Sequence, residues 1–127
     1  MSWSVDLFVD AQEPLPQFVR EVESACDIKF TRFPSDVGER YEYRDPLGVV
    51  CLWEDHELDN DQGINFEDYR YEINVRPYRT TRWEQDQRAG SALASRLFEQ
   101  LKSTGHYRLM LVEELQKKLK VFDPGVP

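Results

Sequence analysis

The feature that most constrains the fold is an acidic stretch at residues 54–68 (EDHELDNDQGINFED), because so many charged groups cannot be buried together. It contains no Lys or Arg, and removing its seven acids from the chain's 24 leaves 17 acids against 16 bases. The net charge of −8 is therefore concentrated in this stretch. Asn60 and Gly63 are typical of a loop. We call residues 54–68 the acidic loop and expect it at the surface.

Two segments with strong strand patterns flank the acidic loop. Residues 48–53 (GVVCLW) are continuously apolar, which is typical of a central strand that is covered on both faces. Residues 69–76 alternate between apolar and polar side chains, which predicts a half-buried strand that Pro77 ends. We therefore expect the core to hold the acidic loop at both ends.

Shorter patterns define the rest of the chain. Alternation predicts strands at residues 3–9, 28–33, 40–44 and 107–112, and Asp45 followed by Pro46 favours a tight turn before residues 48–53. Helical periodicity predicts helices at residues 16–26 and 83–102, the second with Thr80 or Thr81 as N-cap. Residues 113–122 fit either a helix or a strand. We favour a strand or an irregular segment that returns toward the sheet.

The resulting order, β-α-β-β-β-β-α-β, predicts an α+β fold. We expect a two-layer sandwich, in which two helices cover one face of a mostly antiparallel sheet of five to seven strands. The 127 residues suit a single domain, residues 1–127. The patterns do not determine the order of the strands within the sheet.

Composition excludes several classes of protein. The first residues lack the basic region of a signal peptide, and no apolar run reaches the length of a membrane span. Cys26 and Cys51 lack metal-site spacing and are expected to be core thiols in a reducing cytoplasm. A pI of 4.8 opposes binding to nucleic acid, because phosphates would be repelled. A basic protein is the favoured partner.

The acidic loop has three possible uses: a calcium site, a solubility device and a recognition surface. The segment that begins at Asp59 departs from the EF-hand pattern, since its fifth, sixth and twelfth positions are Gly63, Ile64 and Arg70. A zinc site that uses His56 and His106 has no support in their spacing. A solubility role would not require so many clustered acids, because their mutual repulsion is costly. We therefore favour recognition of a basic partner.

Aromatic side chains beside the acids favour an interface further, because Trp and Tyr anchors carry much of the energy of protein interfaces. Equally, Ile64 and Phe66 could pin the acidic loop onto the core. The partner-binding residues that we expect are Trp53, Glu54, Asp55, His56, Glu57, Asp59, Asp61, Phe66, Glu67 and Asp68.

Catalytic signatures are missing from the sequence, which contains no GxSxG and no glycine-rich phosphate loop, so we expect no enzyme and no cofactor. One further cluster is basic and aromatic, and it could bind phosphate or RNA, although arginines more often pair with nearby carboxylates. It consists of Arg76, Tyr78, Arg79, Arg82, Trp83 and Arg88.

In size, acidity and element order the chain resembles, as a class, the immunity proteins of bacterial polymorphic-toxin and contact-dependent inhibition systems. The resemblance rests on no residue-specific motif. It implies an antitoxin that neutralises a basic cognate toxin, such as a nuclease, by charge complementarity. The alternative is a domain that binds a small molecule or a metal ion with the same carboxylates.

Overall fold

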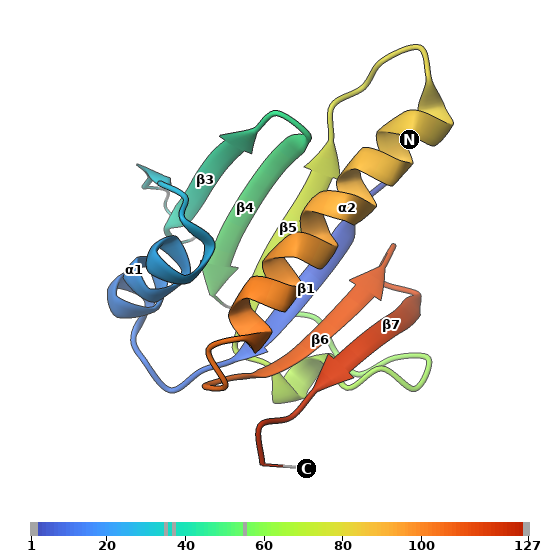
Figure 1. The fold of residues 1–127 in the computed structure, drawn as a ribbon. Helices are drawn as coiled ribbons and strands as arrows, with labels where there is room; N and C mark the ends of the chain where they lie inside the picture. Colours follow the sequence, from blue (N-terminus) through green and yellow to red (C-terminus); the bar gives the residue numbers. More distant parts are fainter. Residues whose placement is uncertain (1–2, 35, 37, 55, 126–127) are drawn as a thin grey trace.

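The computed structural model describes residues 3–34, 36, 38–54 and 56–125, which form one antiparallel sheet and two α-helices (Figure 1). The elements in chain order are β1 (Val5–Asp10), α1 (Leu15–Cys26), β2 (Thr31–Phe33), β3 (Arg40–Asp45), β4 (Gly48–Glu54), a short 3-10 helix η1 (Phe66–Asp68), β5 (Tyr71–Pro77), α2 (Trp83–Lys102), β6 (Arg108–Glu113) and β7 (Lys117–Phe122).

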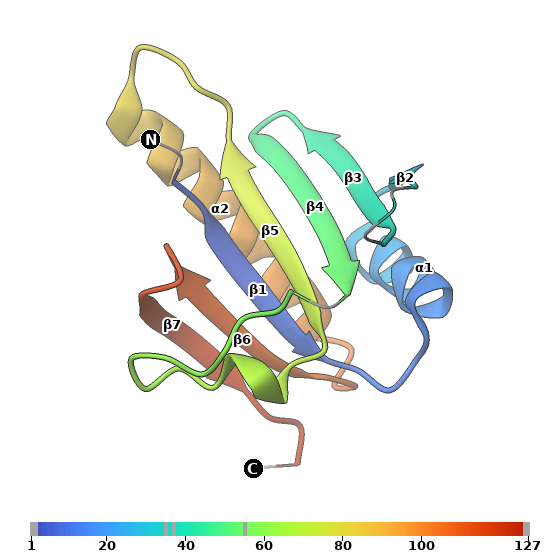
Figure 2. The ribbon, with the colours of Figure 1, turned by 180° about the vertical axis from the view of Figure 1, so that it is seen from behind.

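The sheet has the strand order β2-β3-β4-β5-β1-β6-β7, and every neighbouring pair is antiparallel. The strand β1 lies between β5 and β6, so that Val5 is opposite both Val75 and Glu113. Both helices lie on the same face of the sheet, as the front and back views show (Figures 1 and 2). The predicted α+β two-layer sandwich is confirmed.

The main core lies between the two helices and the sheet. Alternate residues of each inner strand point toward the helices, and α2 contributes a stripe of five buried side chains. Phe18 of α1 stacks on Tyr71 of β5 with ring centroids 4.2 Å apart. The main core residues of β1 and α2 are Val5, Leu7, Val9, Leu93, Ala94, Leu97, Phe98 and Leu101.

Several element boundaries differ from those expected. The strand predicted from residue 28 forms only at Thr31–Phe33. The strand predicted from residue 69 begins at Tyr71, because η1 turns the chain and the N–H of Tyr69 donates to the carbonyl of Phe66. A strand, β7, forms in the ambiguous region and extends the expected element order.

The predicted N-cap of α2 is also wrong, since Arg82 occupies that position. The Thr80 hydroxyl instead accepts a hydrogen bond from the N–H of Arg82 and donates to the carboxylate of Asp86. Thr80 therefore organises the turn before the helix, with Asp86 as its partner.

The second face of the sheet, which is turned away from the helices, is partly covered. On β1, Asp6 and Phe8 point away from the helices and are nevertheless buried, so β1 is covered on both faces. The strand β4 lies third from one edge of the sheet and pairs with both β3 and β5, so it is an interior strand. On its second face Cys51 is buried, whereas Val49 and Trp53 are half-buried, so its predicted coverage on both faces is only partial.

Two expectations about individual features can be compared with the structure directly. Cys26 and Cys51 are both buried free thiols, in agreement with the prediction that they belong to the core. Among the described residues, neither helix has the length and apolarity needed to span a bilayer.

Candidate functional site

The acidic loop joins β4 to β5 and lies across the second face of the sheet, over β1 and β6 (Figure 2). A separate hydrophobic cluster holds it there. The loop contributes Ile64 and Phe66, the neighbouring Tyr69 joins them, and the sheet contributes Phe8, Met110 and Val112. This cluster explains why the second face of β1 is buried.

Phe66 and His56 hold the loop from within. The ring of Phe66 is 3% exposed and meets Phe8 edge-on, with centroids 5.1 Å apart. His56 also meets Phe8 edge-on, its Nδ1 accepts from the N–H of Leu58, and its Nε2 lies 2.8 Å from the carbonyl of Tyr69. These bonds fit the tautomer that carries its proton on Nε2. Two of the expected partner-binding residues therefore face inward.

Hydrogen bonds within the loop fix its backbone. The N–H of Asn60 donates to the carboxylate of Glu67, and the N–H of Glu67 donates to the side-chain oxygen of Asn60, each at 2.9 Å. Asp61 and Ile64 exchange two backbone hydrogen bonds around Gln62 and Gly63, which both have positive φ. Such a turn suits glycine at its second central position. The acidic loop therefore has a defined shape before any partner binds.

Five carboxylates of the acidic loop are exposed, and none of the ion pairs among the described residues involves them. Glu54 differs, because it is half-buried and pairs with Arg70 at 2.5 Å. Asp55 lies outside the described residues. We refer to the remaining set as the five exposed carboxylates: Glu57, Asp59, Asp61, Glu67 and Asp68.

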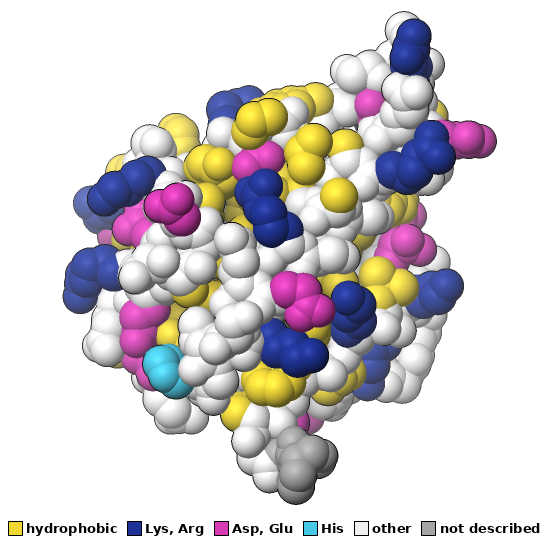
Figure 3. Space-filling model, in the orientation of Figure 1, with side chains coloured by type: hydrophobic (Ala, Val, Ile, Leu, Met, Phe, Trp, Pro, Cys, Tyr) yellow, Lys and Arg dark blue, Asp and Glu magenta, His cyan; other side chains and the backbone are white. Residues whose placement is uncertain are grey.

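Basic side chains at the edge of the loop contact its backbone and amides. Arg108 donates to the carbonyl of Asp68 at 3.1 Å, pairs with Asp10 and lies over the ring of Tyr69. The amine of Lys118 lies 3.4 Å from the side-chain oxygen of Asn65. These bases help to position the loop while the five exposed carboxylates remain directed to solvent. On the opposite, helix-bearing face, acidic and basic side chains are interspersed (Figure 3).

A second group of carboxyls, which the sequence reasoning missed, lies on the same face of the sheet. Asp6 and Glu72 are 1% and 5% exposed and share a hydrogen bond between β1 and β5. Burial, followed by the bond and the charge of Asp6, raises the pKa of Glu72 to about 10. Burial also raises the pKa of Asp6, against the opposing effect of hydrogen bonds from Glu72 and from Asn74 at 2.6 Å.

The strand pairing explains why this carboxyl pair was missed. Both acids occupy polar positions of alternating strands, and alternation assigns such positions to solvent. Only the register, which sets Asp6 opposite Asn74 and Phe8 opposite Glu72, brings the two acids together. The indole of Trp53 also forms a hydrogen bond with Glu72, so this expected anchor residue is half-buried and engaged in the sheet.

The geometry gives no support to a metal site. Within the part of the chain that the structure describes, no group of three or more His, Cys, Asp or Glu side chains is arranged to hold a metal ion. What the acidic loop can do chemically is attract cations and accept hydrogen bonds from them.

Comparison with known proteins identifies no relative. No described protein family, no curated protein and no solved structure matches this chain.

Proposed function

We propose that this protein is a non-catalytic binding module that recognises a basic protein surface through its acidic loop. The observation that carries the proposal is that the five exposed carboxylates lie on a loop fixed by buried anchors and are left out of the ion pairs described above. A concentrated negative charge accelerates the encounter with a basic partner. A preformed loop also loses little conformational entropy when the partner docks.

The specific form of this function that we propose is neutralisation of a basic toxin in the bacterial cytoplasm, by an immunity protein or antitoxin. The supports are the small size, the net charge of −8 and the localised acidity. Because Phe66 and His56 hold the loop, charge would dominate its contribution to binding, and the loop would affect the rate of association more than the rate of release.

The test of binding is a set of matched charge variants. The loop variant carries Glu57→Gln, Asp59→Asn, Asp61→Asn and Glu67→Gln, which retain the shape of each side chain. The control variant removes the same number of charges from exposed acids elsewhere, with Asp36→Asn, Glu84→Gln, Glu99→Gln and Glu114→Gln. Both variants have the same net charge, so any difference between them reports the position of the acids.

The partner is captured from the native host on the wild-type protein, and its association is then measured at low and high salt. We expect the loop variant to associate about tenfold more slowly at low salt, with a weaker salt dependence, and the control variant to stay close to wild type. Equal rates for the two variants would contradict recognition by the acidic loop.

The toxin hypothesis has its own test. The candidate partner is the product of the gene next to this protein's own gene, produced in a host that it harms. Wild-type protein should restore growth, and the loop variant should restore it less well than the control variant. If a captured basic partner is harmless to cells with and without this protein, binding stands and the antitoxin role fails.

A further inference from the structure

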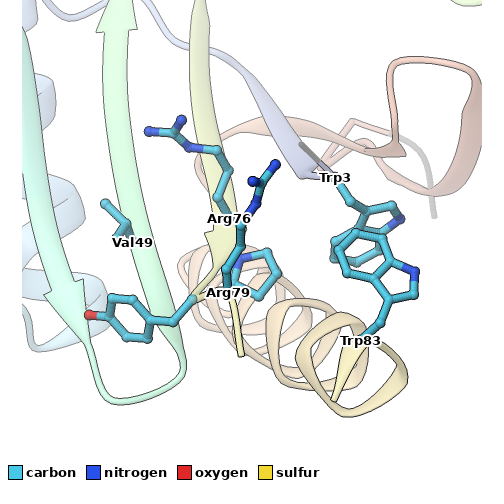
Figure 4. Close-up of a pocket in the computed structure, with 7 residues that line it drawn as sticks. Trp3, Val49, Arg76, Arg79 and Trp83 are labelled. Carbon is cyan, nitrogen blue, oxygen red and sulfur yellow. The ribbon is translucent and has the colours of Figure 1, made fainter. Parts of the chain in front are cut away.

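A cleft of about 300 Å³ lies at the end of the β4–β5 pair that is opposite the acidic loop (Figure 4). The acidic loop lies between the end of β4 and the start of β5, whereas the cleft lies where β4 begins and β5 ends. Six residue steps along β5 separate these ends by about 20 Å. The described lining residues are Trp3, Val49, Arg76, Pro77, Tyr78, Arg79 and Trp83.

The walls of the cleft are held in place by close packing. The hydroxyl of Tyr78 donates to the carbonyl of Asp45 at 2.8 Å, which fixes the Tyr78 side chain against the end of β3. On the other side, the ring of Trp3 lies so close to Gly90 that a Cβ there would be 2.9 Å from Trp3 Cζ3. Pro77 packs against the same glycine. A ligand would therefore meet largely preformed walls.

Two aromatic rings of the cleft remain accessible. Tyr78 is 37% exposed and Trp83, the first residue of α2, is 42% exposed. The space-filling view shows hydrophobic side chains gathered over the end of the sheet where β3 turns into β4 (Figure 3). Flat, accessible rings at the mouth of a cleft are suited to stacking against another planar group.

The charge of the cleft is opposite to that of the whole protein. Its described lining contains two arginines and no Asp or Glu, in a chain with 24 acids and 16 bases. The guanidinium of Arg76 makes a weak 4.0 Å contact with Cys51 Sγ, and no ion pair among the described residues includes Arg76.

Two buried acids of the neighbouring elements β3 and α2 are engaged elsewhere. Asp45 pairs with Arg96 at 2.7 Å, and Asp86 accepts hydrogen bonds from the N–H and the hydroxyl of Thr80. Neither of these carboxylates pairs with Arg76, whose positive charge instead acts on the buried Asp6 and opposes the rise in that group's pKa. Arg76 forms no ion pair with a described residue, so its guanidinium can pair with an anionic ligand.

We propose that this cleft binds a small planar aromatic anion, a molecule of one or two rings that carries a phosphate or carboxylate group. The ring would stack on Trp83 or Tyr78, and the anionic group would pair with the guanidinium of Arg76. A volume of about 300 Å³ lies at the lower end of the range for ligand pockets, which suits a molecule of this size.

The structure favours a small molecule over RNA. Of the basic and aromatic cluster seen in the sequence, only Arg76, Tyr78, Arg79 and Trp83 meet at the cleft. The guanidinium of Arg82 instead lies 3.5 Å from the side-chain oxygen of Gln85. A polynucleotide requires a longer positive track along its phosphates, which a protein of net charge −8 does not offer here. The proposal is independent of the function proposed for the acidic loop.

The test is titration calorimetry with two aromatic anions, AMP and indole-3-acetate, and with their neutral counterparts, adenosine and indole-3-acetamide. We expect at least one anion to bind at least tenfold more tightly than its counterpart. Binding of AMP alone would identify a nucleoside phosphate, and binding of indole-3-acetate alone would identify an aromatic carboxylate. If neither anion binds at millimolar concentration, or if the counterparts bind equally well, the proposal is wrong.

Variants locate the binding within the cleft. Arg76→Gln and Trp83→Ala should each weaken binding of the anion by about tenfold. Arg88→Gln removes the same charge from an exposed position outside the described lining and should leave the affinity unchanged. Circular dichroism checks that each variant is folded. Equal losses in Arg76→Gln and Arg88→Gln would show a nonspecific charge effect and overturn the proposal.

The two functional proposals can fail separately. The loop variant described under Proposed function should bind the aromatic anion as well as wild type does, because the cleft lies at the other end of β5. The Arg76→Gln variant should in turn keep its association with the basic protein partner.

Discussion

Glu72 donates a hydrogen bond to Asp6 between the neighbouring strands β5 and β1, and the two buried carboxyl groups share a proton at neutral pH. Two neighbouring ionised carboxylates that are buried away from water would repel one another strongly. The pair therefore links the stability of the sheet to pH, since the unfolded chain does not retain this proton.

The first prediction is that stability falls as the pH rises. The folded pKa of Glu72 is about 10, whereas the ordinary value is 4.5, so the folded protein holds a proton that the unfolded chain releases. The stabilising contribution is complete below pH 4.5 and is lost progressively as the pH rises toward 10. One such proton lowers the free energy of unfolding by up to about 1.4 kcal/mol per pH unit.

Urea denaturation at several pH values measures this effect, with Glu72→Gln as the comparison. Glutamine can donate the same hydrogen bond to Asp6 without a titrating proton, so the variant should show a much flatter decline between neutral and alkaline pH. If the free energy of unfolding falls with pH equally in wild type and in the variant, the shared proton is refuted.

The second prediction concerns the anchor of the acidic loop. Phe66→Ala should lower the free energy of unfolding by about 3 kcal/mol, because it removes a buried ring that packs on Phe8 and leaves a cavity. Phe33→Ala is the matched control, since Phe33 is 40% exposed on the edge strand β2 and should cost less than about 1 kcal/mol. Similar losses for the two variants would contradict the anchoring role of Phe66.

The third prediction reverses an ordinary rule for helices. An alanine in place of a glycine inside a helix usually stabilises it by about 1 kcal/mol. Gly90→Ala should instead destabilise the protein by about 1–3 kcal/mol, because the new Cβ would lie 2.9 Å from Trp3 Cζ3. In a Trp3→Leu background, where the ring is absent, the same substitution should cost little. Thermal melts of wild type, the two single variants and the double variant give the coupling energy between positions 3 and 90. If the two substitutions have additive effects on stability, the clash is excluded.

The fourth prediction is a loss of stability at acidic pH. Burial alone would raise the pKa of Asp45, but hydrogen bonds from Arg96, the N–H of Leu47 and Tyr43 together hold it below its ordinary value of 3.8. Stability from this group is therefore present above pH 3.8 and is lost as the pH falls through the lower, folded pKa.

Arg96→Gln tests this prediction. The variant should lose roughly 1–2 kcal/mol at neutral pH, because Asp45 loses its charged partner, and the difference from wild type should shrink as Asp45 becomes protonated. Arg88→Gln removes an exposed arginine from the same helix and should have little effect at either pH. If the loss of stability in Arg96→Gln is the same at every pH, the cause is lost packing and not the loss of the ion pair.

Local patterns predicted much of the architecture, because one side of each element is buried. The helix α2 has the bounds that its apolar stripe indicated, and the turn at Asp45 and Pro46 joins β3 to β4 as expected. The surface position of the five exposed carboxylates followed from charge alone, since ionised groups remain hydrated unless they are paired.

Contacts between distant segments could not be predicted in the same way. Alternation places Asp6 and Glu72 on polar faces, but it gives no register and does not show that the acidic loop covers part of that face. Phe66 could equally have been an exposed anchor, because its sequence neighbours are the same in either case. The cleft combines Trp3 with Trp83, which follows it by 80 residues, and no local pattern joins them.

The interior position of β1 in the sheet has a consequence for how the protein folds during synthesis. Val5 pairs with Val75 and Glu113, which follow it by 70 and 108 residues, so the first strand to be synthesised gains both neighbours only after β5 and β6 have appeared. At about 5–20 residues per second, translation leaves this apolar strand without its partners for several seconds or longer. Folding of such nonlocal pairings is also intrinsically slow. The nascent chain is therefore most vulnerable to aggregation at the segment that becomes one of the best protected in the finished sheet.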